Sequence, residues 1–232
     1  MNKKLQTVFG MAFLVSTAFS QTTELHLKTA KVEKTVPRTY FTPIIKVGNS
    51  NLNYGSSNSS VSSYKKQVAG IQAGVALQLG LTSNLSLLSE LYYMRKGGTL
   101  KVNNPLTTNE TTYRFNTFEL PVLARVHMGR VHLNGGPSLA YNLSGKEKTD
   151  IQSKAISFTK AGDGFRRFEA GIGMGGGYTF PTKRKQFVLD IRYNHGLTNI
   201  SYSKEMYNRS IVVSLIAIKP AKTKTTNKDQ SL

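Results

Sequence analysis

Eight stretches of this chain alternate apolar and polar residues with a period of two. Successive side chains of a β-strand point to opposite faces of a sheet, so this alternation predicts strands with one apolar and one polar face. The clearest apolar face consists of Ile71, Ala73, Val75, Leu77 and Leu79. The predicted strands cover residues 41–54, 68–80, 84–96, 112–127, 130–143, 165–180, 186–196 and 207–219. We therefore expect an all-β fold.

The connections between these stretches alternate between long and short. The short ones are Leu81–Ser83, Met128–Gly129 and Pro181–Lys185, and the long ones cover about 55–67, 97–111, 144–164 and 197–206. An up-and-down barrel of the outer membrane has short periplasmic turns and long external loops. Backbone amides in hydrocarbon all need partners, so such a sheet has to close on itself. The sequence therefore predicts an eight-stranded antiparallel up-and-down transmembrane β-barrel.

The N-terminus has the pattern of a secretory signal peptide. The basic residues of MNKK precede an apolar stretch over Leu5–Phe19, and the small residues Ala18 and Ser20 precede Gln21. The expected regions are a cleaved signal peptide (1–20), a polar periplasmic lead-in (21–40), the barrel domain (41–220) and a basic disordered tail (221–232). Export followed by a membrane barrel predicts a location in the outer membrane of a Gram-negative bacterium.

The composition limits the kinds of chemistry and partner that the chain can have. The chain contains no cysteine and has a formal net charge of +19. The absence of cysteine excludes disulfides, thiolate metal sites and a cysteine nucleophile. A strongly basic balance indicates anionic partners such as lipid phosphates, polyanionic sugars or nucleic acid, and export makes nucleic acid the least expected of them. Solvated lysines in loops explain the same charge without a specific partner.

Charged residues recur on the polar faces of the predicted strands, which in a membrane barrel point into the lumen. The set consists of Glu90, Glu119, Glu169 and Asp190 together with Arg125, Arg167 and Arg192. Buried charges persist only when they are paired and hydrogen-bonded, so we expect a structural network of ion pairs that fills the lumen. A proton-sensitive or ion-sensitive lumen with shifted pKa values is the alternative.

The predicted loops carry lysines that would face the phosphate-rich outer leaflet. They are Lys65, Lys66, Lys146, Lys148, Lys154 and Lys160. Clustered cations attract lipid phosphates, so we expect contact with outer-membrane lipid and specifically with lipopolysaccharide. Lysines that are only solvated by water are the competing interpretation.

Motifs that would support catalysis or a cofactor are weak. Gly171, Gly173 and Gly176 fit the pattern G-x-G-x-x-G, but a dinucleotide site needs a helix after this motif, and strand residues and Pro181 follow it here. The histidines are scattered and lack the spacing of a metalloprotease site. No enzymatic activity, cofactor or metal site is therefore expected. Glycines at alternate positions of this strand instead predict space for larger side chains in the lumen.

Five segments, taken in their order along the chain, carry a family resemblance. They are SELYYMRKGG (89–98), FELPVLARV (118–126), NGGPSLAYNL (134–143), FEAGIGMGGGY (168–178) and LDIRYNHGLTNI (189–200). Together they resemble the PorT-like outer-membrane β-barrel family of Bacteroidetes-type bacteria. The resemblance implies an eight-stranded outer-membrane barrel without enzymatic activity as a class property. It also implies a link to protein secretion, because the family's namesake is linked to the machinery that exports proteins across the outer membrane.

The predicted function is a structural or interaction role in the cell envelope, with a link to protein secretion as its more specific form. One alternative is a narrow channel for ions or small solutes, which would show steady single-channel openings. A second alternative is a soluble periplasmic ligand binder with a lipocalin-like closed sheet, which would need an apolar interior and a polar exterior. An outer-membrane hydrolase would need a catalytic arrangement that the sequence does not contain.

Overall fold

The computed structural model describes residues 39–218, except 57, 161, 183 and 184. In this part of the chain ten strands form one sheet, and eight of them are long. The long strands are β1 (Tyr40–Asn53), β3 (Val68–Gly80), β4 (Leu85–Leu100), β5 (Thr111–Met128), β6 (Val131–Thr149), β8 (Phe168–Pro181), β9 (Gln186–Gly196) and β10 (Tyr207–Ile218). The short elements are β2 (Lys65–Lys66), β7 (Ser153–Ala155) and the 3-10 helix η1 (Ser59–Tyr64). Each predicted strand coincides with one long strand.

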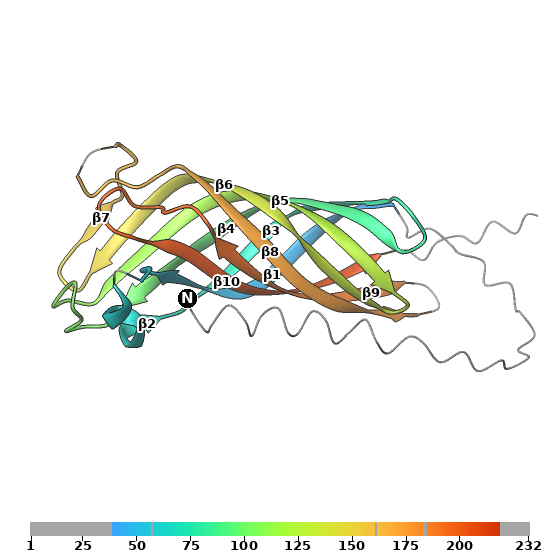
Figure 1. Ribbon diagram of the computed structural model, residues 1–232, viewed down its shortest axis with the longest axis horizontal. Helices are drawn as coiled ribbons and strands as arrows, with labels where there is room; N and C mark the ends of the chain where they lie inside the picture. The colour runs from blue at the N-terminus through green and yellow to red at the C-terminus, as the bar shows by residue number, and fades with distance from the viewer. Residues whose placement is uncertain (1–38, 57, 161, 183–184, 219–232) are drawn as a thin grey trace, which may run out of the picture. The chain divides into compact units, whose positions relative to one another are not determined.

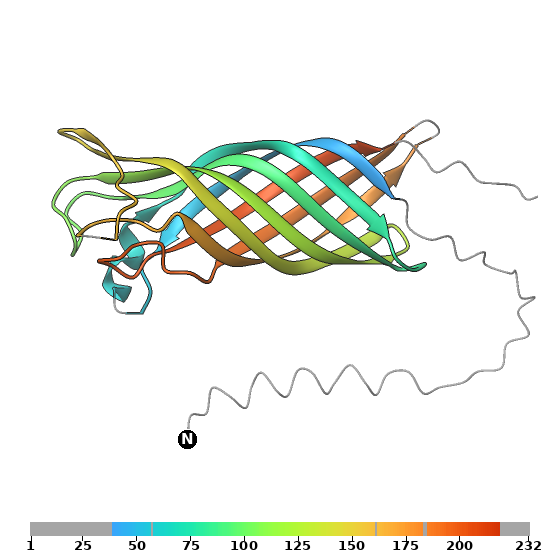
Figure 2. The ribbon, with the colours of Figure 1, turned by 90° about the horizontal axis from the view of Figure 1, so that it is seen from above.

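The long strands close into a barrel, in which each strand is tilted relative to the barrel axis (Figures 1 and 2). Their order in the sheet is β4, β3, β1, β10, β9, β8, β6 and β5, and β5 pairs again with β4. The first and last long strands pair antiparallel, from Lys46 opposite Ser214 to Asn53 opposite Tyr207. Apart from this closing pair, neighbours in the barrel are also neighbours along the chain. The predicted eight-stranded antiparallel up-and-down barrel is confirmed.

The two faces of the sheet differ in chemistry, as the alternation requires. In β1, Ile45 and Val47 point outward and are 67% and 55% exposed, whereas Lys46 between them is 2% exposed. Other exposed apolar residues include Ile71, Leu91, Phe118, Leu120, Leu133, Leu139, Phe168, Ile191 and Leu215. An apolar outer face and a polar interior are typical of a barrel surrounded by lipid.

Two strands extend beyond their predicted ends on the side of the long loops. β4 continues to Leu100 and β6 to Thr149, so parts of two predicted loops are strand. The ladder continues there because the outer part of β5 is paired on both sides. Thr112 lies opposite Thr99 of β4 and opposite Lys148 of β6. These extensions contain polar residues that interrupt the apolar alternation, so the alternation did not predict them.

The strand predicted over 165–180 begins later, at Phe168. Phe165 instead forms an isolated bridge with Ser201 in another loop. Its ring is 5% exposed and packs among apolar residues of the loops. Contacts between distant loops therefore decide the start of β8, and local alternation does not.

The alternating glycines of β8 leave room for side chains in the lumen. A Cβ atom placed on Gly177 would lie 2.6 Å from Cε1 of His132. One placed on Gly173 would lie 3.0 Å from Oδ1 of Asn194 and 3.4 Å from Cδ of Arg192. A larger residue at either position would displace these polar groups, which agrees with the space that the glycine pattern predicts.

Several predicted regions lie outside the described residues. They are the signal peptide (1–20), nearly all of the lead-in (21–40) and the tail (221–232). Within the described part of the chain, no helix has the length and apolar character needed to cross a membrane.

Candidate functional site

The lumen is filled by charged side chains, with Glu90 of β4 near their centre. Nη1 and Nη2 of Arg192 in β9 donate hydrogen bonds of 2.7 and 3.3 Å to its two carboxylate oxygens. Nζ of Lys46 in β1 forms an ion pair with the same carboxylate. None of the three side chains is more than 2% exposed. Alternation in three separate strands thus brings these groups together.

Asp190 lies on the same face of β9 as Arg192 and nearer to the short turns. Nη2 of Arg192 donates to its Oδ1 over 3.2 Å, and Nη2 of Arg125 donates to its Oδ2 over 2.9 Å. Nδ2 of Asn134 donates to Oδ2 over 2.6 Å, and Nε2 of His132 lies 2.9 Å from the same oxygen. Arg192 therefore connects two buried carboxylates into one cluster.

A second cluster lies nearer to the long loops. Nζ of Lys96 in β4 lies 2.8 Å from Glu169 and 3.8 Å from Glu119. The hydroxyl of Tyr92 donates to Glu119 over 3.0 Å. The amide of Asn142 donates to Glu169 over 2.6 Å. Both carboxylates therefore have a cation and a neutral donor beside them.

The two clusters, together termed the lumen network, balance their charges. Four carboxylates face four cations: Glu90, Glu119, Glu169 and Asp190 face Lys46, Lys96, Arg125 and Arg192. Equal numbers of opposite charges offset the cost of removing each of them from water. Each carboxylate has at least two donors, at least one of which is a cation.

Six of the seven side chains predicted to point into the lumen belong to the lumen network, and Arg167 does not. Arg167 precedes β8 and is exposed, and its Nη1 donates over 3.3 Å to the carbonyl oxygens of both Asn142 and Leu143. Its guanidinium lies 4.6 Å from the ring centroid of Phe158. The prediction for Arg167 is wrong because β8, whose alternation placed it inward, begins only at Phe168.

Sequence reasoning missed three members or neighbours of the network, namely Lys46, Lys96 and His132. The signal for the two lysines was present. Lys46 lies between two apolar residues that both point to the outer face of β1, so alternation points Lys46 inward. Lys96 shares the face of β4 that carries Glu90. His132 shares a face with Asn134 in β6, but its proximity to the carboxylate in β9 depends on the strand register, which the sequence does not show.

Two small cavities adjoin the lumen network. One is lined by Lys96, Glu119 and Glu169 and has a volume of about 30 Å³, and the other, beside Gln72 and Met94, has a volume of about 10 Å³. Spaces of this size hold one or a few water molecules. Among the residues that the structure describes, no group of three or more histidine or acidic side chains could hold a metal ion.

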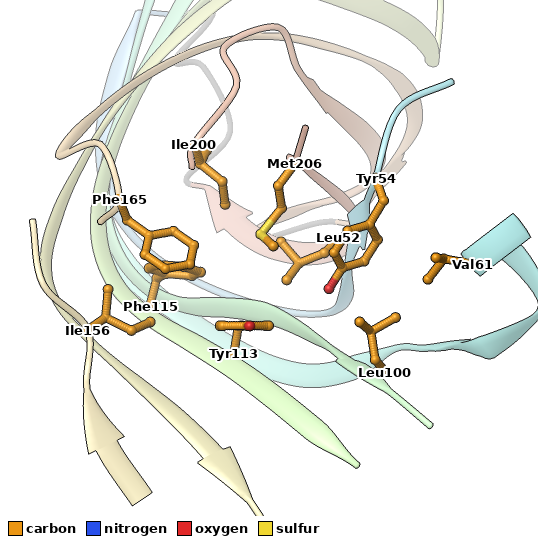
Figure 3. Close-up of a cluster of buried hydrophobic side chains, with 10 residues drawn as sticks. All are labelled: Leu52, Tyr54, Val61, Leu100, Tyr113, Phe115, Ile156, Phe165, Ile200 and Met206. Carbon is orange, nitrogen blue, oxygen red and sulfur yellow. The ribbon is translucent and has the colours of Figure 1, made fainter. Parts of the chain in front are cut away.

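The long loops pack onto the barrel through a cluster of buried apolar side chains, termed the loop cap (Figure 3). Its members are Leu52, Tyr54, Val61, Leu100, Tyr113, Phe115, Ile156, Phe165, Ile200 and Met206. The ring centroid of Phe165 lies 5.3 Å from that of Phe115 and 5.7 Å from that of Tyr113. Burial raises the pKa of Tyr54, and the Glu147 carboxylate raises it further. Three separate long connections are ordered by this packing.

The six lysines predicted to face lipid all lie at the loop end of the barrel, but in two groups. Lys65 and Lys66 form β2, which pairs with the end of β4. The second group consists of Lys146 and Lys148 in β6, Lys154 in β7 and Lys160 in the following loop. β2 and β7 lie on opposite sides of the loop end in Figure 1. The lysines therefore do not form one continuous patch.

Comparisons with known proteins found similar solved structures and one matching family model. The structure is similar to Ail, the attachment invasion locus protein of Yersinia pestis, at 14% identity, with 75% of this chain and 95% of that chain covered and a TM-score of 0.40. It is also similar to Neisserial surface protein A, at 10% identity, with 78% and 97% covered and a TM-score of 0.45. No curated protein matches the chain. The family model described as outer membrane protein beta-barrel domain matches residues 37–202, so the chain belongs to this family.

Proposed function

We propose that this protein is a non-enzymatic, non-conducting barrel of the outer membrane whose loop end has an interaction role in the cell envelope. The lumen network carries this proposal, because it fills the lumen with paired charges. A lumen filled in this way supports neither transport nor catalysis. The loop cap supports the interaction role, because it gives the external connections a defined arrangement.

The lumen network argues against a narrow channel. To open a path, the side chains around Glu90 and Asp190 would have to separate, which would leave charges unpaired inside the barrel. Breaking a buried ion pair costs roughly 3–5 kcal/mol. The two cavities beside the network have volumes of only about 30 and 10 Å³.

The distribution of apolar surface argues against a soluble ligand binder. A lipocalin-like protein would need an apolar interior to hold its ligand and a polar exterior. Here Phe41 and Ile71 on the outer face are 69% and 67% exposed, while Arg125 and Arg192 inside are each 2% exposed. This orientation supports a barrel whose outer wall contacts lipid.

Conductance tests the proposal directly. Purified protein inserted into a planar lipid bilayer is expected to show no steady single-channel openings in concentrated potassium chloride, because the paired charges of the lumen network occupy the interior. A porin inserted in the same bilayer serves as the control for insertion. Steady openings of the folded wild-type protein would support the channel alternative and contradict the proposal.

The partners form the more specific part of the proposal. The PorT-like resemblance of the five segments supports a role linked to protein secretion. The loop lysines support contact with lipopolysaccharide, and exposed apolar loop residues such as Ile151 and Leu197 support contact with an envelope protein. A strain that lacks this chain should then release less secreted protein into the medium, and unchanged release would remove the link to secretion.

A further inference from the structure

A broad groove crosses the outer wall of the barrel, where β10, β1, β3 and β4 lie next to one another. Its volume is about 1010 Å³. Small residues line its middle, among them Gly48 of β1 and Ala69 and Gly70 of β3. The larger side chains of Tyr193 in β9 and Tyr93 in β4 line its two sides. The lumen network lies on the inner face of the same strands, so the groove is a separate site.

The chemistry of the groove changes along the direction of the strands. It is lined by four cations, of which Lys65, Arg114 and Arg209 lie close to the loop ends of their strands, while Arg95 lies further along β4, beside Gly70 of β3. Its part nearer the short turns is lined by apolar residues, namely Val47, Ile71, Ile211 and Val213. The register places Arg209 opposite Asn51 and Val213 opposite Val47. The groove is therefore cationic toward the loops and apolar toward the middle of the wall.

The four cations have no acidic partners. Among the described residues, none of them forms an ion pair with a carboxylate. Nε of Arg95 donates to Oδ1 of Asn116 over 3.2 Å, and Nε of Arg209 is buried without a hydrogen-bond partner. Burial and the neighbouring Arg209 lower the pKa of Lys65. Arg209 thus lies near Lys65, and Arg95 and Arg114 lie on the neighbouring strands β4 and β5, so the groove has two pairs of like charges. Each pair is stabilised when an anion lies beside it.

We propose that this groove binds a phosphorylated, multiply acylated lipid of the outer leaflet, namely the lipid A part of lipopolysaccharide. Guanidinium groups bind phosphate oxygens through paired hydrogen bonds, so we assign one phosphate of lipid A to Arg95 and Arg114 and the other to Arg209 with Lys65. The acyl chains lie along the apolar part of the groove. This orientation matches the leaflet, because the cations lie at the loop end, which faces outward in an outer-membrane barrel. The inference rests on the outer-membrane location in the proposed function and gives the expected lipid contact a specific site.

Fluorescence provides a local readout, because the chain contains no tryptophan. Ile71→Trp places a single fluorophore in the groove. Titration of the folded protein in zwitterionic detergent with bis-phosphorylated lipid A is expected to change its emission and to saturate. At low salt, the triple variant Arg95→Gln, Arg114→Gln, Arg209→Gln in this background is expected to weaken binding on the order of 100-fold, because each cation near a lipid phosphate contributes to affinity.

A matched variant distinguishes a specific binding site from general electrostatic attraction between the lipid and the protein. Lys146→Gln, Lys148→Gln, Lys154→Gln removes the same charge from the other lysine group and is expected to change affinity by less than about threefold. Lipid A without phosphates should compete weakly. If the triple arginine variant does not fold, Arg114→Gln alone carries the test, with an expected loss of roughly fivefold.

Three results would overturn the inference: no saturable emission change, equal losses in the two triple variants, or equal binding of dephosphorylated lipid A. A shift in gel migration between unboiled and boiled samples shows that each variant is a folded barrel. Failure of binding in a folded, non-conducting protein would refute the groove and leave the proposed function intact. Loss of the gel shift or steady conductance in the wild-type protein would instead refute the proposed function.

Discussion

Replacing Arg192 with alanine is expected to destabilise the folded barrel by roughly 3–5 kcal/mol. Arg192 is 2% exposed and pairs with both Glu90 and Asp190. Its removal leaves two buried carboxylates with fewer partners, and an uncompensated buried charge is costly. The loss of stability is measured from the midpoint of urea unfolding in lipid vesicles, with the heat-dependent shift in gel migration as the readout of folded protein. Arg125→Ala, which removes another partner of Asp190, should act in the same direction.

Arg167→Ala is the matched control for this prediction. Alternation alone placed Arg167 in the lumen, whereas its side chain lies outside the barrel and is exposed. Its loss should therefore change the free energy of unfolding by less than about 1 kcal/mol, as for other exposed charges. Equal effects of Arg192→Ala and Arg167→Ala would show that the lumen network does not stabilise the barrel.

Replacing Phe115 with alanine is expected to lower the free energy of opening the loop cap by roughly 3–5 kcal/mol. The Phe115 side chain is fully buried, and its ring centroid lies 5.3 Å from that of Phe165. The cavity left by the ring would remove the contact that joins a strand of the barrel to a loop. Hydrogen exchange should therefore speed up in residues 150–167 and 197–206, while exchange in β9 should stay unchanged.

Phe168→Ala is the control for the loop cap. Phe168 lies only a few residues from Phe165 along the chain, but it points outward and is 72% exposed. Its removal takes away an apolar ring without creating a buried cavity, so exchange in the loops should change little. Unchanged exchange in the loops of Phe115→Ala would contradict the view that the loop cap orders them.

The strands and the direction of their faces could be predicted from the sequence, because both depend on the period of two. Ile71 and Leu79 lie on one side of β3 in the sheet just as alternation requires. The outer ends of β4 and β6 could not be predicted in this way. Those segments lie beyond the apolar band. They pair with β5 through backbone hydrogen bonds, which do not require apolar side chains, so their sequence shows no hydrophobic alternation.

The content of the lumen could be predicted only in part. Alternation placed Glu90 and Asp190 inside, and the same alternation places Lys46 there. Which acid pairs with which cation depends on register. Glu90 and Arg192 are 102 positions apart and meet because β4 and β9 face each other across the barrel.

The loop cap and the outer groove could not be predicted from the sequence. The cap depends on contacts between loops far apart in the chain, such as those of Tyr54, Phe165 and Ile200. Such contacts produce no periodic pattern in the sequence. The groove depends on the relative level of residues in adjacent strands, which places Arg209 beside Asn51. The loop lysines expected to contact lipid therefore include Lys65, whereas the groove's three arginines lie in strands and have no such signal.

Closure of the sheet between β1 and β10 is the central claim, and a disulfide tests it directly because the chain contains no cysteine. Val47 lies opposite Val213, and Val213 lies opposite Ile191 in the next strand. Oxidation of the Val47→Cys, Val213→Cys variant in intact outer membranes is expected to give an intramolecular disulfide. Val47→Cys with Ile191→Cys should give none, because two strand spacings of about 4.8 Å separate these positions. Absence of the first disulfide, or equal formation of both, would contradict the closed barrel.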